Sequence, residues 1–474
     1  MLLKKRKRLT SLIFILVICL IWIYSRKDAA NEQSVRKVPY IEKKVTIQPR
    51  SQELPNVEKK NMNAIKMLKL SMKDLFQNRH TVVQNVSFSR QHTLVADISK
   101  LDIPLHATKQ QPYSYKIDNL VFGITTTVER LVHIIRSLRF WARDIGIQCL
   151  VTFHHTERNN LETVRKLFEM EQIPCLTDIT FTHRYVERFF DLVNRTWSLL
   201  ANKKNGSSNK EFKWLLIGDD DTLWFIPNLL RTLNNYNYEK PIYLGDHSDH
   251  LESMQRFGRY YAYGGGGIAL SRPLAQNLAH NISFCDKYKE LFGGDMMLGK
   301  CVTEVMKVQL SRDVTFHQMD IRGDATGYFE SGIQGLVSIH HMFSWWSPVP
   351  RWVSEDKEDI VNRFYQAYRS TSFSYLKRYV WIDWEYNETL VLTLGYSVTI
   401  YNQSLTSEQI TAVEATFCCV PLVRRSRTPI THRQTWYFSK SYTKNQSSGN
   451  VLHHIYEYSA ADSNSSYILV MFYS

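Results

Sequence analysis

The chain has 474 residues and a formal net charge of +14, with 44% apolar and 13% aromatic residues. This composition is typical of a globular protein and excludes a chain that is disordered over most of its length. Five of the positive charges lie in the run Lys4–Arg8, and the others are spread thinly along the sequence. The charge pattern therefore does not indicate a nucleic-acid-binding protein.

The N-terminus carries a targeting signal. A basic segment, 1–8, is followed by an almost wholly apolar segment, 9–24, which ends in Trp22-Ile23-Tyr24. The apolar segment is shorter than the ~20 residues of a typical spanning helix, and a cleaved signal peptide is the alternative. No small-x-small cleavage pattern follows, and terminal aromatic residues suit a membrane interface. We therefore interpret 1–8 as a cytosolic tail and 9–24 as a signal-anchor transmembrane helix, which places the rest of the chain in the lumen of the secretory pathway.

Two features agree with a lumenal location. The sequence contains N-x-Ser/Thr sequons at Asn85, Asn194, Asn205, Asn281, Asn387, Asn402, Asn445 and Asn464. Outside the anchor there are cysteines at positions 149, 175, 285, 301, 418 and 419, and an even number of cysteines in an oxidising compartment suggests disulfides. We expect the pairs Cys149–Cys175 and Cys285–Cys301, because each lies within one local unit. Buried thiols are the alternative.

The predicted elements form three regions along the chain. Residues 25–115 are interpreted as a stem, in which 61–76 has the pattern of one amphipathic helix. In 116–350, short apolar runs alternate with helical patterns: strands are predicted over 119–124, 147–153, 178–182 and 213–217, and helices over 128–141, 157–170 and 185–203. This alternation predicts an α/β domain with a central, mostly parallel sheet. Residues 351–474 lose the alternation and are rich in Tyr, Trp, Thr and Val, so we predict a smaller, mostly β module there.

An acidic triplet, Asp219-Asp220-Asp221, follows the apolar strand that ends at Ile217. Ligands bind outside the carboxyl ends of the strands in sheets of this kind. Three adjacent carboxylates repel one another, and a bound cation relieves the repulsion. Carboxylate oxygens suit Mg²⁺ or Mn²⁺, which bridge the protein to substrate phosphates. The alternative is an exposed acidic turn, which the apolar residues on both sides of the triplet disfavour.

Three further segments combine glycine or polar residues with apolar runs. The loop Gly264-Gly265-Gly266-Gly267 permits close approach of a ligand to the backbone. Asp295 follows two glycines at a predicted helix start, where an aspartate is commonly an N-cap and, in a pocket, can be a general base. His340 and His341 end a strand-like run, either as ordinary strand-end residues or as metal ligands beside the carboxylates.

Motifs within residues 117–350 resemble the Fringe-like glycosyltransferases of glycosyltransferase family 31. The resemblance is closest to the plant and fungal type of subgroup, and it rests on five motifs in the same order: Gly218–Thr222, Ala262–Gly267, Gly293–Asp295, Phe316–Asp320 and Ser338–His341. The resemblance implies a GT-A type fold, a UDP-sugar donor, and Mn²⁺ or Mg²⁺ as cofactor. It also implies a type II layout in the membrane of the Golgi or the endoplasmic reticulum.

The resemblance implies a role for each matching residue. Asp295 would be the catalytic base, and Asp221, Asp219 and His340 would hold the metal, with His341 as the alternative ligand. The donor would be bound by Gly123, Thr125, Thr126, Arg130, Asp219, Asp220, Gly264, Gly265, Gly266 and Gly267. The expected reaction is inverting transfer to a hydroxyl of a glycan or glycoprotein acceptor, which usually forms a β1,3 linkage. The expected partners are this donor, this acceptor and the membrane, without nucleic acid, and a homodimer is left open.

Two positions depart from the family pattern. Met296 stands where many relatives have a second aspartate, and Phe343 stands where they often have an acidic residue. These departures keep one alternative open, a lumenal pseudo-glycosyltransferase that binds glycan or nucleotide without turnover. A metal-dependent hydrolase would need a second activated nucleophile, which the sequence does not offer.

Overall fold

The computed structural model describes residues 66–71, 81–85, 93–95, 113–144, 146–198, 212–320, 323–333, 335–342, 345–348, 357–371, 374–406, 408–410, 433–446, 449–458 and 466–473. All of them belong to one compact unit, Asn61–Ser474. The predicted tail and signal anchor lie outside the described residues. Within the described part, none of the helices combines the length and apolar character needed to cross a bilayer.

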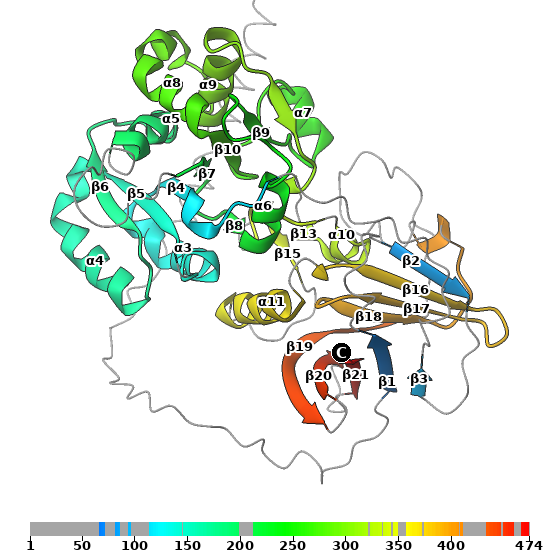
Figure 1. The fold of residues 1–474 in the computed structure, drawn as a ribbon. Coiled ribbons are helices and arrows are strands. Elements are labelled where there is room, and N and C mark those ends of the chain that lie inside the picture. Colours follow the sequence, from blue (N-terminus) through cyan, green and yellow to red (C-terminus); the bar gives the residue numbers. More distant parts are fainter. Residues whose placement is uncertain are drawn as a thin grey trace, which may run out of the picture. The chain divides into compact units, whose positions relative to one another are not determined.

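The N-terminal two-thirds of this unit is built on a seven-stranded sheet (Figure 1). Its order is β11 (Leu310–Arg312), β9 (Tyr243–Gly245), β10 (Ile268–Ser271), β7 (Trp214–Ile217), β4 (Leu120–Thr125), β5 (Gln148–His154) and β6 (Leu176–Thr180). Strands β7, β4, β5 and β6 are parallel to one another, and only β10 runs antiparallel to its neighbours. The mostly parallel sheet that we predicted is therefore confirmed.

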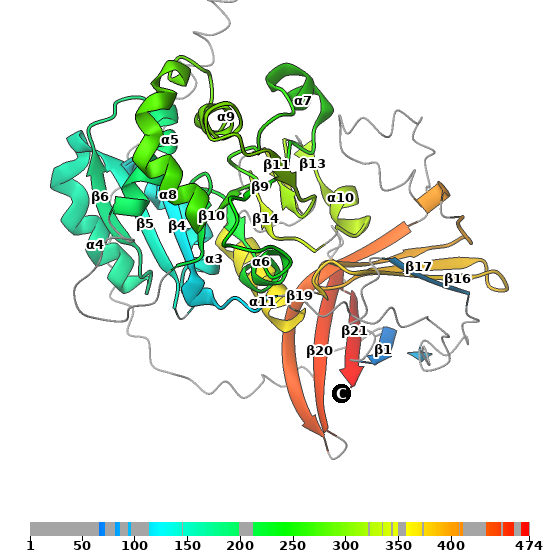
Figure 2. The same ribbon diagram turned by 45° about the horizontal axis from the view of Figure 1, so that its top comes forward.

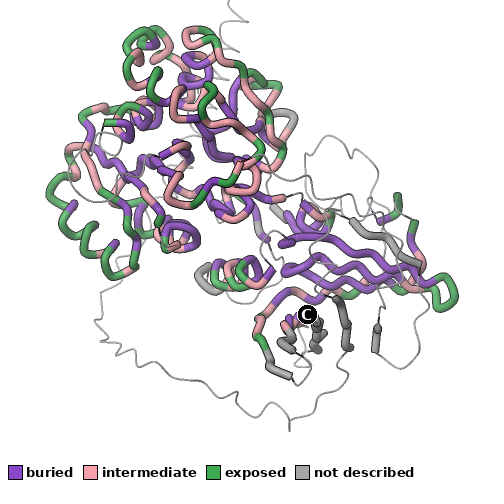
Figure 3. Tube along the Cα trace, viewed as in Figure 1, coloured by how far each residue is buried: buried purple, intermediate pink, exposed green. Residues whose placement is uncertain are grey.

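Helices cover both faces of this sheet, as Figures 1 and 2 show. One apolar cluster joins it to α3 (Val128–Trp141), α4 (Leu161–Met170) and α6 (Ile226–Leu233), and the other joins it to α5 (Tyr185–Thr196), α8 (Arg272–Asn281) and α9 (Gly294–Lys300). Side chains alternate between the faces, so Leu216 lies in the first cluster and Leu215 in the second. Because both faces are covered, β7 is an unbroken apolar run and the central strands are buried along their length (Figure 3).

Two small sheets and several short helices complete this domain. One sheet has the order β12 (Phe316–His317), β14 (Ser338–Ile339), β8 (Leu223–Trp224), and the other pairs β13 (Gly323–Asp324) with β15 (Trp346–Ser347). The remaining helical elements are η3 (Ile117–Asn119), η4 (His155–Asn160), α7 (Leu251–Phe257), η6 (Ile282–Tyr288), η7 (Cys301–Val305) and α10 (Thr326–Glu330). The predicted disulfides Cys149–Cys175 and Cys285–Cys301 are both present.

The C-terminal region contributes α11 (Lys357–Thr371) and most of a nine-stranded sheet. The order of this sheet is β2 (Thr81–Asn85), β16 (Arg378–Asp383), β17 (Glu388–Thr393), β18 (Ser397–Tyr401), β19 (Arg433–Gln446), β20 (Gly449–Tyr458), β21 (Ser466–Tyr473), β1 (Lys66–Ser71) and β3 (Thr93–Val95). Strands β16 to β21 pair antiparallel in chain order. The α/β domain and the mostly β module after it, both of which we predicted, are therefore confirmed by their sheets.

The structure differs from the predictions in three places. The amphipathic helix expected over 61–76 is wrong, because Lys66–Ser71 is a strand that pairs in parallel with β21. A short apolar run fits either element, and a distant pairing partner decides which one forms. Strands β1, β2 and β3, all within the predicted stem, thus belong to the C-terminal sheet. Strand β6 begins two residues earlier than predicted, and α5 ends at Thr196, before the expected end at 203.

Candidate metal and nucleotide site

The acidic triplet lies at the carboxyl end of β7, as the sequence predicted. A tight turn follows the strand, in which the amide of Thr222 donates to the carbonyl of Asp219 at 3.1 Å. The Thr222 hydroxyl donates to the carbonyl of Gly265 at 2.9 Å, which ties the turn to the glycine loop. The carboxylates of Asp219 and Asp221 are about one-quarter exposed, whereas that of Asp220 is fully buried. The three aspartates therefore have different surroundings and different roles.

Asp220 is an internal partner for Thr126, which follows β4, and for Arg130 in the first turn of α3. Its carboxylate accepts hydrogen bonds from Nε of Arg130 at 2.7 Å and from the hydroxyl of Thr126 at 2.6 Å. The second guanidinium nitrogen of Arg130 lies 2.5 Å from the other carboxylate oxygen. The guanidinium is thus held in a bidentate pair, and its hydrogen bond to Asp220 raises the pKa of Arg130. Thr127 caps α3 by accepting from the amide of Arg130, which fixes the direction of this helix start.

A possible metal-binding group is formed by Asp221, His340 and His341, whose candidate ligand atoms lie within 4.8 Å of one another. Nε2 of His340 lies 2.8 Å from Oδ1 of Asp221 and 3.5 Å from Oδ2 of Asp219. Nδ1 of His341 lies 3.9 Å from Oδ2 of Asp221. Two carboxylates and an imidazole nitrogen thus converge on one point, and this donor set fits a divalent cation. Of the two histidines, His340 is the closer to both carboxylates.

The electrostatics of this group also fit a cation. Burial, aided by the charge of Asp221, raises the pKa of Asp219 to about 7. Burial also favours the neutral acid at Asp221, but the adjacent His340 outweighs it and holds the pKa of Asp221 well below its usual range. The same carboxylates overcome the burial of His340 and raise its pKa to about 9. The site therefore attracts positive charge strongly, and a bound metal would supply that charge in place of the imidazolium proton.

The glycine loop packs directly against the metal group. A Cβ atom at Gly265 would lie 2.0 Å from Nδ1 of His340, and one at Gly267, where φ is +88°, would lie 2.2 Å from the Trp224 ring. Only glycine permits these approaches. The amide of Gly266 donates to Oε1 of Gln318 at 2.7 Å, and that of Gly267 donates to the carbonyl of Gly264 at 3.0 Å. These two amides are thus hydrogen-bonded to other groups of the protein. Contacts between the loop and the sugar donor stay a prediction.

Asp295 lies in the first turn of α9, beside the glycine loop. Its Oδ2 accepts from the amide of Gly264 at 2.8 Å, and its Oδ1 accepts from the amide of Met296 at 2.8 Å. Burial raises the pKa of this carboxyl although the two backbone hydrogen bonds oppose the shift. The negative charge of Asp295 also contributes to the raised pKa of Asp219, so the two carboxyl groups are near enough to interact.

Two predicted donor-binding residues are covered by protein. A Cβ atom at Gly123 would lie 2.8 Å from the hydroxyl oxygen of Thr196 in α5, so a glycine is needed here for helix packing. Thr125 is fully buried, and its carbonyl accepts from the hydroxyl of Tyr185 at 3.4 Å. Their predicted contacts with the donor stay predictions.

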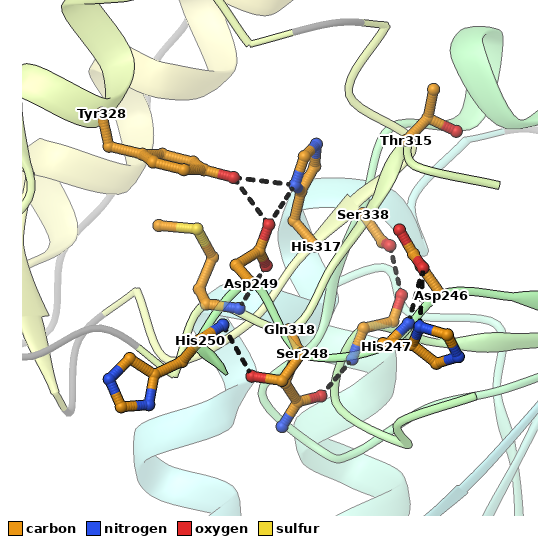
Figure 4. A network of polar contacts seen from close by, with 12 residues as sticks. Asp246, His247, Ser248, Asp249, His250, Thr315, His317, Gln318, Tyr328 and Ser338 are labelled. Carbon is orange, nitrogen blue, oxygen red and sulfur yellow. Dashed lines mark hydrogen bonds and ion pairs between the residues drawn. The ribbon is translucent and has the colours of Figure 1, made fainter. Parts of the chain in front are cut away.

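A polar network that the sequence did not predict borders the site. Figure 4 shows its members, which include Asp249, His317 and Tyr328. Asp320 joins this network to the metal group, because its Oδ2 accepts from the hydroxyl of Ser248 at 2.5 Å and its Oδ1 lies 3.8 Å from Nε2 of His341. Only the motif Phe316–Asp320 pointed to this region, and it gave no role to the individual residues.

Comparisons with known proteins found similarities in both sequence and structure. Residues 254–467 match the family described as "Protein of unknown function, DUF604". The chain is 34% identical over 124 residues to a beta-1,3-glucosyltransferase of Mus musculus, a match that covers 26% of this chain and 24% of the relative. It is 32% identical over 210 residues to a beta-1,3-glucosyltransferase of Homo sapiens, covering 38% of this chain and 41% of the relative. The chain thus spans less than half of each relative's length.

Solved structures of glycosyltransferases are similar to part of the chain. The mannosyltransferase PcManGT from Pyrobaculum calidifontis, in complex with GDP-Man and Mn²⁺, is 11% identical and covers 54% of this chain and 63% of its own, with a TM-score of 0.30. The galactosyltransferase LgtC, in complex with donor and acceptor sugar analogues, is 10% identical and covers 53% and 99%, with a TM-score of 0.31. Parts of this chain are thus similar in sequence to a family of unknown function and to two beta-1,3-glucosyltransferases.

Proposed function

We propose that the chain is a Fringe-like, inverting, Mn²⁺-dependent glycosyltransferase. It transfers a sugar from a UDP-sugar to a hydroxyl of a glycan or glycoprotein acceptor and forms a β1,3 linkage. The observation that carries this proposal is the convergence of Asp219, Asp221 and His340 at a strand end, with Asp295 hydrogen-bonded to the glycine loop beside them. The two beta-1,3-glucosyltransferase relatives support the reaction class and make UDP-glucose the first donor to test.

The residues divide the chemistry between two groups. Asp221, Asp219 and His340 would hold the metal, which when bound neutralises charge on a diphosphate. The bidentate pair with Asp220 holds the Arg130 side chain, which is still about half exposed. The exposed part of its guanidinium group can therefore bind an anionic donor. This pre-orientation lowers the entropy lost when the donor binds.

Asp295 is the proposed base. The acceptor oxygen forms a bond to the anomeric carbon of the sugar, the bond from that carbon to the diphosphate oxygen breaks, and UDP leaves with the electron pair. The acceptor proton passes to the Asp295 carboxylate, whose pKa is raised by burial and is thus closer to the operating pH. Hydrogen bonds from Gly264 and Met296 fix the direction of this carboxylate. A single displacement needs no covalent enzyme intermediate and inverts the anomeric centre.

The proposed location is the Golgi or endoplasmic reticulum membrane, with segment 9–24 as the single anchor and the catalytic domain in the lumen. Two disulfides support it, because such bonds persist in oxidising compartments. The exposed sequon residues Asn194, Asn387 and Asn402 are consistent with glycosylation there.

The test is UDP release by the full-length chain with Mn²⁺, first with UDP-glucose and then with other UDP-sugars and acceptor glycans. Asp295→Asn should abolish transfer while UDP still binds, and Asp221→Ala should lose both. If wild type and Asp221→Ala release equally little UDP with every donor, the enzyme proposal fails. Tight UDP binding without turnover would instead identify a pseudo-glycosyltransferase.

A further inference from the structure

In the polar network of Figure 4, the carboxylate of Asp249 binds residues from two other segments of the chain. Oδ1 of Asp249 accepts from the hydroxyl of Tyr328 at 2.7 Å and lies 2.9 Å from Nδ1 of His317. Oδ2 accepts from the amide of Met319 at 2.8 Å. These contacts join three parts of the chain, namely the segment before α7, the turn after β12, and helix α10. Asp249 therefore locks the turn after β12 to α10.

The turn after β12 carries this constraint to the glycine loop. Met319 has φ +55°, a left-handed conformation that non-glycine residues adopt only when their surroundings hold them there. The hydrogen bond from its amide to Asp249 supplies such a hold. The preceding Gln318 then accepts from the amide of Gly266 at 2.7 Å and donates to Oδ1 of Asp320 at 3.3 Å. The position of this turn thus sets the glycine loop, which packs on His340.

A second route from α10 reaches His340 through apolar contacts. Phe329 follows Tyr328 in α10, and its ring centroid lies 5.3 Å from that of Trp346. Nε1 of Trp346 donates to the carbonyl of His340 at 3.1 Å, in a buried contact. Adjacent residues of one short helix therefore support the metal group from two directions, Tyr328 by hydrogen bonds and Phe329 by packing.

The C-terminal module holds α10 in place. The hydroxyl of Thr393 at the end of β17 donates to the carbonyl of Glu330 at 3.0 Å, and the carboxylate of Glu330 lies 3.4 Å from a guanidinium nitrogen of Arg433 in β19. Glu330 is 2% exposed, so this ion pair is shielded from solvent on the glutamate side. Phe329 also packs against Tyr396, with ring centroids 5.1 Å apart.

We infer that Asp249 and Tyr328 are positioning residues of the metal site, and that the C-terminal β module supports this site through α10. The inference rests on the proposed function and gives residues 351–474 a part in it. It assigns no contact between these residues and substrate. The module holds α10 in place, and α10 in turn positions the glycine loop and the backbone of His340. The affinity of the site for a divalent cation therefore depends on the module.

The test measures Mn²⁺ binding to the full-length chain from the electron paramagnetic resonance signal of free Mn²⁺, which requires no turnover. Tyr328→Phe removes one oxygen atom and should weaken Mn²⁺ binding by about 2- to 30-fold, the usual range for couplings of this kind. Tyr288→Phe is the matched control, because it removes a phenol that also donates to a carboxylate at 2.7 Å, that of Glu304. Transfer by Tyr328→Phe should recover at saturating Mn²⁺, which loss of folded protein would not allow.

The module is tested in the same assay by Arg433→Met. Arg369→Met is its control, since Arg369 forms its ion pair with Asp144, at 3.1 Å, and not with a residue of α10. Weaker Mn²⁺ binding in Tyr328→Phe and Arg433→Met, with both controls at the wild-type value, is the expected result. If Tyr328→Phe binds Mn²⁺ as Tyr288→Phe does, the positioning role is overturned, and equal binding by Arg433→Met and Arg369→Met overturns the role of the module.

A folding defect does not leave the inference undecided. If Tyr328→Phe does not fold, Gln318→Met breaks the same chain of contacts nearer to Gly266, and wild-type Mn²⁺ binding by that variant would overturn the inference. Failure of the proposed function has a different signature, which is wild-type protein that transfers no sugar from any donor. The Mn²⁺ comparison among the variants still decides the inference in that case.

Discussion

Gly265→Ala is expected to weaken metal binding sharply. The added methyl group would lie 2.0 Å from Nδ1 of His340 and 2.2 Å from its Cε1, whereas ordinary contacts begin at 3.4 Å. The imidazole must therefore shift by more than the tolerance of ~0.2 Å that metal–ligand distances allow. Its Nε2 now lies 2.8 Å from Asp221, so a shift of this size removes it from the donor set. We expect Mn²⁺ affinity to fall by about 10- to 100-fold, or about 1.4–2.7 kcal/mol.

The assay is Mn²⁺ titration of wild type and variant, with thermal unfolding of both measured without metal. Gly266→Ala is the matched control, because a methyl group there would lie 3.2 Å from its nearest neighbour, the amide nitrogen of Gln318, and relaxation of a few tenths of an ångström relieves it. Its Mn²⁺ affinity should change by less than that of Gly265→Ala. Wild-type affinity in Gly265→Ala would refute the argument that close packing of this loop positions His340.

Three other changes test what stabilises the fold. Arg130→Ala leaves the buried Asp220 carboxylate without its bidentate partner, and urea unfolding should show a loss of about 1–3 kcal/mol. Burial lowers the pKa of His454 to about 3, so the unfolded chain takes up a proton below about pH 6.5 that the folded chain refuses. The free energy of unfolding should therefore be unaffected by His454 above about pH 6.5 and should be lower by about 2 kcal/mol at pH 5. Urea titrations above about pH 6.5 and at about pH 5 should show this loss in the wild type and not in His454→Gln. Replacing Cys149 and Cys175 by serine should lower the free energy of unfolding by about 2–4 kcal/mol in calorimetry, and an unchanged value would contradict the stabilising role of this disulfide.

The sequence predicted the strand that leads to the acidic triplet. Strand β7 and the triplet after it were predicted because a fully buried parallel strand is an unbroken apolar run, and polar residues at its end stand out. The glycine loop was recognised from composition, but its packing on His340 was not, because that contact joins residues 75 positions apart in chain order. Tyr328 and Asp249 were also missed, because their contact joins distant parts of the chain and neither residue lies in a periodic pattern. The helix predicted over 61–76 failed because β21 determines the conformation of Lys66–Ser71.

The pairing of β1 with β21 has a consequence for biosynthesis. Lys66 pairs with Ile468, so the two strands are separated by about 400 residues of chain. At a translation rate of about 5–20 residues per second, β1 leaves the ribosome about 20–80 s before its partner strand is made. The nine-stranded sheet therefore cannot be completed during most of synthesis. In that interval, strand edges that are paired in the finished sheet are exposed to other chains. Folding of this protein should thus depend on chaperones that shield β1 and other unpaired strands until β21 has been synthesised.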